Sequence, residues 1–154
     1  MKNLLPAMLL LILFGCADKT DTNERKDGFT PVLKTREDSL FHEVMQGHDV
    51  GMAKMGKLSR YTRYTRRAID SLNQLSAGKS DKQLLQKYSA MLEKFVQADD
   101  EMSNWMVNFK VDTLKSDVNA REAYLLSEKI KVERVRDLIL ESERIGDSVF
   151  KKVQ

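Results

Sequence analysis

Apolar side chains recur along most of the chain at alternating steps of three and four residues, the heptad spacing of coiled-coil helices. They do so in three stretches, which predict helices over residues 36–76, 81–109 and 120–152. Short connections between such helices place neighbours side by side in opposite directions. The pattern therefore predicts an all-α fold, an antiparallel up-down-up bundle of three long, coiled-coil-like helices.

Each predicted helix has one apolar stripe that should face the core. The first stripe changes phase once, at Leu58, and its other members are Phe41, Met45, His48, Met52, Met55, Ile69, Leu72 and Leu75. The second stripe consists of Leu85, Tyr88, Leu92, Phe95, Asp99, Met102, Met106 and Phe109. The third includes Leu125, Val132, Val135, Ile139 and Val149.

Capping patterns mark the predicted helix starts. Residues 35–38 (Thr-Arg-Glu-Asp) and 80–83 (Ser-Asp-Lys-Gln) resemble capping boxes, with Ser80 as the second cap. Asn119, with Glu122 three positions later, can cap the third helix, and Gly78 supplies a stop after the first.

The N-terminus predicts an export signal over residues 1–15. Lys2 precedes an apolar run over 4–14, which as a helix spans about 16 Å, roughly half of a bilayer's hydrocarbon core. That length is typical of a signal peptide and too short for a membrane-spanning helix. The alternatives are an ordinary secretory signal with an incidental cysteine, or a buried apolar segment.

The run ends at residues 13–16 (Leu-Phe-Gly-Cys), which resemble the lipobox of bacterial lipoproteins, although Phe14 stands where that motif usually has a smaller residue. The resemblance implies cleavage after Gly15, a thioether-linked diacylglycerol on Cys16 and a third acyl chain on its new amino group. Several acyl chains suffice for stable anchoring. Because Ala17, not Asp, follows the cysteine, the sorting pattern implies the outer membrane, on either its periplasmic or its surface face.

Residues 16–34 carry the cysteine and then a polar, charged segment with almost nothing to bury. Such a composition cannot offset the entropy of ordering, so we expect a flexible tether whose ends lie roughly 25 Å apart. Residues 35–154 then form the single helical domain.

Composition excludes several function classes. With 26 basic and 23 acidic residues the net charge is only +3, which does not favour a nucleic-acid partner. The single cysteine excludes an intramolecular disulfide and any multi-thiolate metal site. The sequence has no nucleophile–base set, phosphate-binding glycine loop or HExxH motif, so it predicts no enzyme and no required cofactor.

One candidate site involves soft metal ligands. If the first two helices pair about the turn near residues 78–79, then Met55 faces Met102, Met52 faces Trp105 and His48 faces Phe109. The candidate ligands are His48, Met52, Met55, Met102 and Met106, beside the aromatic ring of Trp105. Thioethers and imidazole favour Cu(I), and a tryptophan face adds a cation–π contribution.

The alternative is that these methionines simply fill the core, as methionine at helical spacing usually does. In that case His48 is hydrogen-bonded to a neighbouring carboxylate. Asp99, on an otherwise apolar stripe, is expected to be buried and paired with Lys57 or Arg60.

Two short segments carry a family resemblance. Residues 48–56 read HDVGMAKMG and residues 101–106 read EMSNWM, and together they resemble small Bacteroidota lipoproteins that carry the label "viral A-type inclusion protein". The resemblance covers about 70 residues of the first two predicted helices. It implies a helical envelope lipoprotein with no catalytic residue and nothing viral.

Residues 57–67 are basic and aromatic. Lys57, Arg60, Arg63 and Arg67 are candidate contacts to anionic lipid headgroups, lipopolysaccharide or glycan, and the three arginines share one helix face. The alternative is a solvated face whose charges pair with Glu133, Glu141 and Glu143.

Gly47 and Gly51 form a GxxxG pattern that lets another helix approach closely, either within the bundle or in a homodimer. Together, the patterns predict a non-catalytic, lipid-anchored outer-membrane protein that binds an envelope protein, glycan or lipid through its helical faces. The alternative is a Cu(I)-binding lipoprotein.

Overall fold

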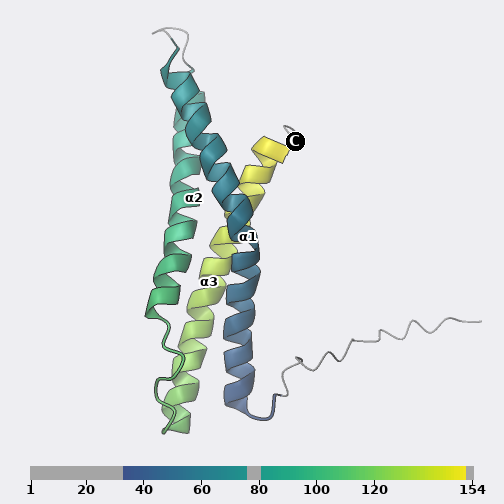
Figure 1. Ribbon diagram of the computed structural model, residues 1–154, viewed down its shortest axis with the longest axis vertical. Helices are drawn as coiled ribbons and strands as arrows, with labels where there is room; N and C mark the ends of the chain where they lie inside the picture. Colours follow the sequence, from purple (N-terminus) through teal and green to yellow (C-terminus); the bar gives the residue numbers. More distant parts are fainter. Residues whose placement is uncertain (1–32, 76–80, 152–154) are drawn as a thin grey trace, which may run out of the picture. The chain divides into compact units, whose positions relative to one another are not determined.

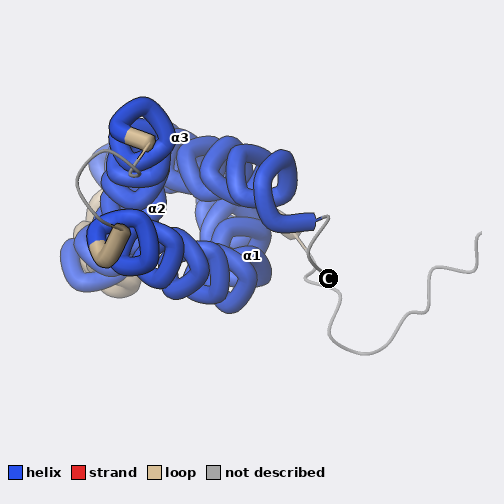
Figure 2. Tube along the Cα trace, turned by 90° about the horizontal axis from the view of Figure 1, so that it is seen from above, coloured by secondary structure: helices blue, strands red, loops and turns tan. Residues whose placement is uncertain are grey.

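A computed structural model describes residues 33–75 and 81–151 and contains three helices: α1 (Arg36–Asn73), α2 (Lys82–Asn108) and α3 (Val118–Phe150). The described residues form no strand. All three pairs of helices contact one another, so the protein is an all-helical three-helix bundle (Figures 1 and 2). The predicted signal peptide, Cys16, Gly78 and nearly all of the predicted tether lie outside the described residues.

The capping residues explain where the helices begin. The predicted capping box of α1 is confirmed: the Thr35 hydroxyl accepts the Asp38 N–H at 3.0 Å, and the Asp38 carboxylate accepts the Thr35 N–H at 3.0 Å. These hydrogen bonds stabilise the charged carboxylate, so the pKa of Asp38 is lowered.

The other two helices are capped by different residues from those predicted. The N-cap of α2 is Asp81, not Ser80, and the N-cap of α3 is Asp117, not Asn119. Asp81 accepts the Gln83 and Leu84 N–H groups, and Asp117 accepts the Ala120 N–H, each at 3.0 Å. An aspartate carboxylate both accepts these bonds and complements the positive end of the helix dipole, which explains why it is the cap in both places.

The buried stripe of α3 follows the predicted heptad. Leu125, Val132, Val135 and Ile139 are buried and Val149 is partly buried. The same spacing also buries residues that the apolar pattern alone did not include: Arg121, Glu128, Ser142, Gly146 and Phe150. Helix α3 therefore keeps one face toward the core along its whole length.

The stripes of α1 and α2 follow the predicted ones only in part. Leu58, Phe95 and Met102 are buried as predicted. In the first part of α1, however, Leu40, Val44, Gly47 and Gly51 are buried, each one residue before the predicted member. In α2, Ala98 and Trp105 are buried, whereas the predicted Asp99 and Met106 are exposed. A one-residue shift turns a helix by about 100°, so a different face of the helix meets the core at these positions.

Glycines account for this shift in α1. A Cβ at Gly47 would lie 2.9 Å from Val132 Cγ1, and a Cβ at Gly51 would lie 2.6 Å from Met102 Cε and 3.3 Å from Ile139 Cδ1. The missing side chains therefore let α2 and α3 pack tightly against α1. The close approach that the GxxxG pattern permits is used inside the bundle.

Ion pairs run along the contact between α1 and α3. Arg36 pairs with Glu122 at 3.2 Å, Lys129 with Glu43 at 2.6 Å and Lys57 with Glu143 at 3.0 Å. In each pair the two residues are 86 positions apart, so the register between the helices is constant. The aromatic rings of Tyr61, Tyr64, Tyr88, Phe95 and Phe150 close the core beyond these pairs.

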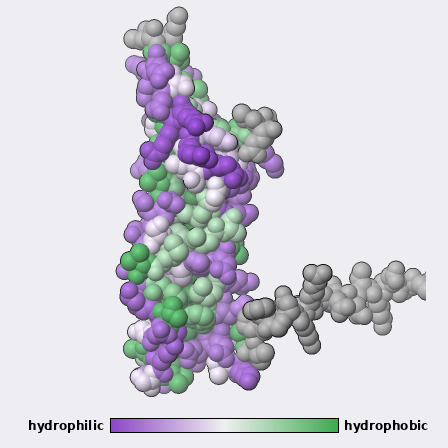
Figure 3. Space-filling view, viewed as in Figure 1, coloured by the Kyte–Doolittle hydropathy of each residue, from purple (hydrophilic) through white to green (hydrophobic). Residues whose placement is uncertain are grey.

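The face of the bundle shown in Figure 3 is polar in its upper part and mixed below. Hydrophilic side chains are densest over the upper part, and weakly and strongly apolar side chains lie among hydrophilic ones over the middle and lower parts. Within residues 33–75 and 81–151, none of the helices has the stretch of uncharged apolar sequence that a membrane span requires.

Candidate functional site

His48, Trp105 and Met106 meet at the contact between α1 and α2. The His48 Nε2 atom lies 3.4 Å from Met106 Sδ, and the His48 and Trp105 ring centroids are 5.8 Å apart with an interplanar angle of 38°. On the other side of the imidazole, Nδ1 lies 2.9 Å from Asp49 Oδ1. His48 therefore faces Trp105 and Met106, about one helical turn from the predicted Phe109.

The other three predicted methionine ligands have different environments. Met102 is completely buried, with its methyl group against Gly51. Met55 is partly buried and packs on the core, and Met52 is 39% exposed. Among the described residues, only Met106 brings a sulfur atom within 4 Å of a His48 ring nitrogen as a hydrogen-bond partner.

The soft donors that the structure brings together are thus one imidazole nitrogen and one thioether. Both groups suit Cu(I), and a monovalent soft ion accepts low coordination numbers more readily than Zn²⁺ does. The part of the chain that the structure describes contains no group of three or more His, Cys, Asp or Glu side chains placed to hold a metal ion.

Trp105 is held firmly in the core. Its Nε1–H donates to Glu128 Oε2 at 3.0 Å, and its ring stacks on Phe109 with centroids 4.9 Å apart and planes 17° apart. Glu128, itself only 5% exposed, also accepts a hydrogen bond from Lys131 Nζ at 2.7 Å. This bond raises the pKa of Lys131. The Glu128 carboxylate thus accepts hydrogen bonds from two donors, which satisfies its hydrogen-bonding capacity in the buried position, as is usual for buried polar groups.

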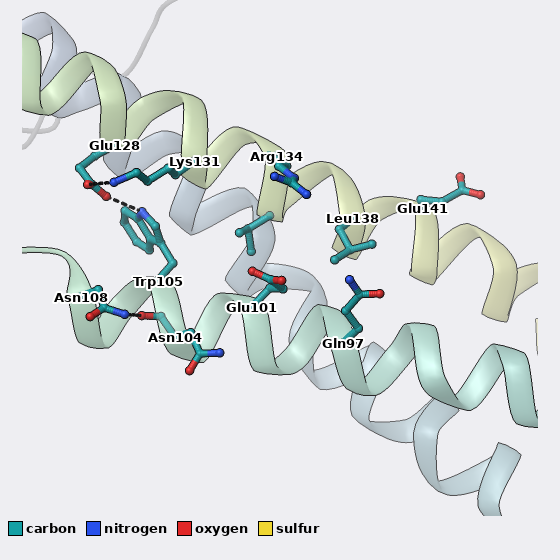
Figure 4. Close-up of a pocket in the computed structure, with 11 residues that line it drawn as sticks. Gln97, Glu101, Asn104, Trp105, Asn108, Glu128, Lys131, Arg134, Leu138 and Glu141 are labelled. Carbon is teal, nitrogen blue, oxygen red and sulfur yellow. Dashed lines mark hydrogen bonds and ion pairs between the residues drawn. The ribbon is translucent and has the colours of Figure 1, made fainter.

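An open groove of about 760 Å³ runs between α2 and α3 beside this tryptophan (Figure 4). Its lining combines apolar side chains with amides and charges of both signs: Gln97, Glu101, Asn104, Trp105, Asn108, Glu128, Lys131, Arg134, Val135, Leu138 and Glu141. In Figure 4, Gln97 of α2 points toward Leu138 of α3, and Arg134 lies on the same side of α3. The lining could accept polar ligands of several kinds and selects for none of them.

Lys57 was one of the four predicted contacts to an anionic surface, but it forms ion pairs with acidic residues of α3. Its Nζ atom lies 2.6 Å from Asp147 Oδ1 and 3.0 Å from Glu143 Oε1. The Tyr61 hydroxyl also donates to the Asp147 carboxylate. These contacts raise the pKa of Lys57 and lower that of Asp147, while burial raises the pKa of Tyr61.

The three predicted arginines behave differently. Arg60, Arg63 and Arg67 are exposed, and no ion pair within the described residues joins them to a carboxylate. Two of the three acidic residues expected to pair with them have other partners: Glu143 pairs with Lys54 and Lys57, and Glu141 pairs with Arg144 at 2.8 Å. We refer to Arg60, Arg63 and Arg67 as the arginine face.

Nearby, Asp99 is exposed, and the expectation that it is buried was wrong. It lines a small depression of about 270 Å³ with Leu58, Arg66 and Asp100. The neighbouring residue Ala98 takes the buried position in its place. Lys57, expected as a partner of Asp99, bonds α3 instead.

The most important residue that the sequence analysis missed is Arg121, which is only 2% exposed. Its Nε atom donates to Glu37 Oε1 at 3.0 Å, and its two terminal nitrogens donate to the Thr113 and Val111 carbonyls at 3.0 and 2.7 Å. It lies four positions before Leu125 on the α3 stripe. That heptad spacing is the signal that could have identified it.

Comparisons with protein-family models, with curated proteins and with solved structures find no significant match for the chain.

Proposed function

We propose that the protein is a non-catalytic, lipid-anchored envelope protein that acts as a helical binding and scaffold module, and that its arginine face holds an acidic partner. The observation that carries this proposal is the lack of an ion pair to Arg60, Arg63 or Arg67 within the described residues. Neighbouring charged side chains of α1, by contrast, are paired with α3.

Guanidinium groups suit this role because each presents several N–H donors in a planar fork that matches carboxylates and phosphates. The three arginines follow the i, i+3, i+7 spacing of one helix face. The same face includes Gly56, around which a Cβ would meet no atom within 4 Å, so a ligand can approach it without obstruction. An acidic protein, a glycan or an anionic lipid would all present suitable groups.

The scaffold part of the proposal is an antiparallel, up-down-up arrangement with coiled-coil packing. The constant register of the ion pairs supports α1 and α3 running in the same direction. Contacts of Tyr61 with Phe95 and of Phe41 with Phe109 support α2 running in the opposite direction. The spacing of buried positions in α3 supports the heptad character.

The anchor part of the proposal places acyl chains on Cys16 and the protein at the outer membrane, as the lipobox resemblance implies. Radiolabelled palmitate should be incorporated into the mature protein and not into a Cys16→Ser variant. Absence of label from the natural chain would contradict the anchor. Relationship to the small helical envelope lipoproteins that the sequence resembles is part of the same proposal.

Binding of the non-acylated Cys16→Ser protein to heparin and to vesicles containing phosphatidylglycerol tests the arginine face, because both probes are polyanionic and no acyl chain holds this protein on the vesicles. In this protein, Arg60→Gln with Arg63→Gln and Arg67→Gln should weaken binding to both probes strongly, and the protein with all three arginines should lose affinity as salt rises. A control with Lys82, Lys87 and Lys94 of α2 changed to glutamine has the same net charge and should bind nearly as the protein with all three arginines does. Equal losses in the two variants would show that only total charge matters and would contradict the proposal.

A specific observation favours a second candidate, Cu(I) binding, namely the 3.4 Å contact between His48 Nε2 and Met106 Sδ beside the Trp105 ring. Cu(I) added to the natural chain should then quench Trp105 fluorescence. His48→Ala and Met106→Leu should abolish the quenching, whereas Met91→Leu, which changes a buried methionine elsewhere in α2, should preserve it. Fluorescence that does not respond to Cu(I) eliminates this candidate.

A further inference from the structure

The end of the bundle where α1 begins carries a group of exposed aliphatic side chains. They are Leu33, Val111, Leu114 and Val118, which we call the loop-end apolar group. Arg121 links the α2–α3 connection to α1. It donates hydrogen bonds both to Glu37, near the start of α1, and to two backbone carbonyls of the connection. Figure 1 shows the start of α1 and this connection at the same end of the three helices.

Leu114 is the most informative member of this group. Its φ is 59°, in the left-handed region that favours glycine or asparagine, so a leucine here destabilises the folded chain. The side chain is nevertheless 46% exposed, so nearly half of it is open to a partner outside the bundle. A strained, exposed leucine suggests that it contacts something outside the bundle.

Charges in the connection do not oppose an apolar partner. Lys115 forms an ion pair with Asp112, which lowers the pKa of Asp112, and Asp117 is occupied as the cap of α3. Lys110 Nζ donates to the Val107 carbonyl at 3.1 Å. The connection thus has two basic and two acidic side chains, so its net charge is zero.

We propose that the loop-end apolar group inserts into the interfacial region of the bilayer that holds Cys16. This inference rests on the lipid anchor of the proposed function. Seventeen residue-to-residue steps separate Cys16 from Leu33 and can span at most about 61 Å, so the anchor delivers this end of the bundle to the membrane at high effective concentration. A few aliphatic side chains that would bind a free bilayer weakly can then stay inserted.

The same geometry assigns different tasks to different parts of the bundle. The loop-end apolar group contacts the anchoring membrane, whereas the arginine face lies farther along α1, beyond the ion pairs with α3. When the loop-end apolar group contacts the bilayer, the arginine face lies away from the membrane to which Cys16 is anchored.

The experiment uses the full lipidated protein in vesicles that contain nitroxide-labelled lipid. Because acylation blocks Cys16, the variant Leu114→Cys offers one reactive thiol for an environment-sensitive dye, and Ser89→Cys on α2 is the matched control site. We expect blue-shifted emission and quenching by the lipid nitroxide at position 114 and neither at position 89. Equal, unquenched emission at both sites overturns the proposal, and so does a blue shift at 114 without quenching, which would indicate a second copy of the chain.

A second set of variants separates membrane contact from folding. With the dye at Val111→Cys, Leu114→Asn should remove most of the quenching while it leaves the bundle as stable as before or more stable. The control Ile130→Asn changes an exposed aliphatic residue of α3 outside the connection and should leave the quenching unchanged. Protein that floats with the vesicles without quenching refutes the loop contact alone, whereas protein that does not float refutes the anchor and the loop contact together.

Discussion

The ring of Tyr61 in α1 lies directly on Gly146 of α3, where an added Cβ would come within 2.6 Å of Tyr61 Cε2. The same ring stacks on Phe150, with centroids 5.6 Å apart. The hydroxyl at its edge donates to Asp147, next to the glycine. A glycine at this position of the α3 stripe thus lets a whole aromatic ring fit between two helices that otherwise pack through aliphatic side chains.

We predict that Gly146→Ala lowers the free energy of unfolding by about 1–3 kcal/mol, the usual cost of overpacking a close-packed core. The tyrosine ring is completely enclosed and cannot move aside without displacing Phe150. Urea denaturation followed by circular dichroism measures the change.

Gly56→Ala is the matched control, because a Cβ there meets no atom within 4 Å. Alanine in an exposed helix position is favoured over glycine, so this variant should gain about 0.5–1 kcal/mol. If Gly146→Ala also gained stability, the close packing of Tyr61 on α3 would be wrong.

A second prediction concerns acid. The hydrogen bonds from Lys57 and Tyr61 hold the pKa of Asp147 below its ordinary value of 3.8. A lowered folded-state pKa contributes stability that is present above the ordinary pKa and is lost as pH falls through the folded-state pKa. Asp147→Asn should therefore lower the free energy of unfolding at neutral pH. It should also make that free energy depend less on pH below about pH 4.

Urea denaturation at a series of pH values measures this effect. The exposed pair of Arg136 and Asp137, joined at 2.8 Å, provides the comparison, since surface ion pairs contribute little. Asp137→Asn should leave both the neutral stability and the acid limb nearly unchanged. An Asp147→Asn variant with the natural pH profile would disprove the stabilising role of this carboxylate.

A third prediction tests Arg121 as the residue that holds the α2–α3 connection. Arg121→Leu would leave the Glu37 carboxylate and two carbonyls without their donor, and we expect a loss of about 2–4 kcal/mol. Proteolysis within residues 109–117 should become faster. Arg144→Leu, at the exposed i, i+3 pair with Glu141, should change stability by less than about 0.5 kcal/mol and leave proteolysis unaltered.

A fourth prediction concerns Ser142, whose buried hydroxyl has no hydrogen-bond partner within the described residues. An unsatisfied buried polar group costs about 1–3 kcal/mol, so Ser142→Ala should stabilise the bundle. Ser148→Ala controls for the higher helix propensity of alanine, because the exposed Ser148 hydroxyl donates to the Ile145 carbonyl at 2.7 Å. Thermal denaturation should rank Ser142→Ala above Ser148→Ala, and the reverse order would contradict the unsatisfied hydroxyl.

The apolar pattern was sufficient to find α3 and its core positions. Val132, Val135 and Ile139 are large aliphatic residues at heptad spacing, so the same side chains that mark the stripe also fill the core. It was not sufficient for α1, where Gly47 and Gly51 face the core. Hydrophobic periodicity gives glycine almost no weight, so the predicted stripe followed Met52 and the neighbouring large residues instead.

The candidate metal site shows the same limit. The sequence indicated that His48, Trp105 and Met106 would lie close together, and the structure brings these three residues into contact. It does not place Met52, Met55 and Met102 in comparable positions. The pairing of two helices depends on how closely their backbones approach, and a displacement of one helical turn changes which side chains meet.

The sequence by itself determined that this chain forms three helices, because heptad spacing and helix caps depend on residues close together along the chain. Only the tertiary structure decided that glycines of α1 are buried, where Arg121 and Glu128 find their partners, and that Arg60, Arg63 and Arg67 form no ion pair with the described residues. Those outcomes depend on the distance and rotation between helices, which are set by the packing of all three together.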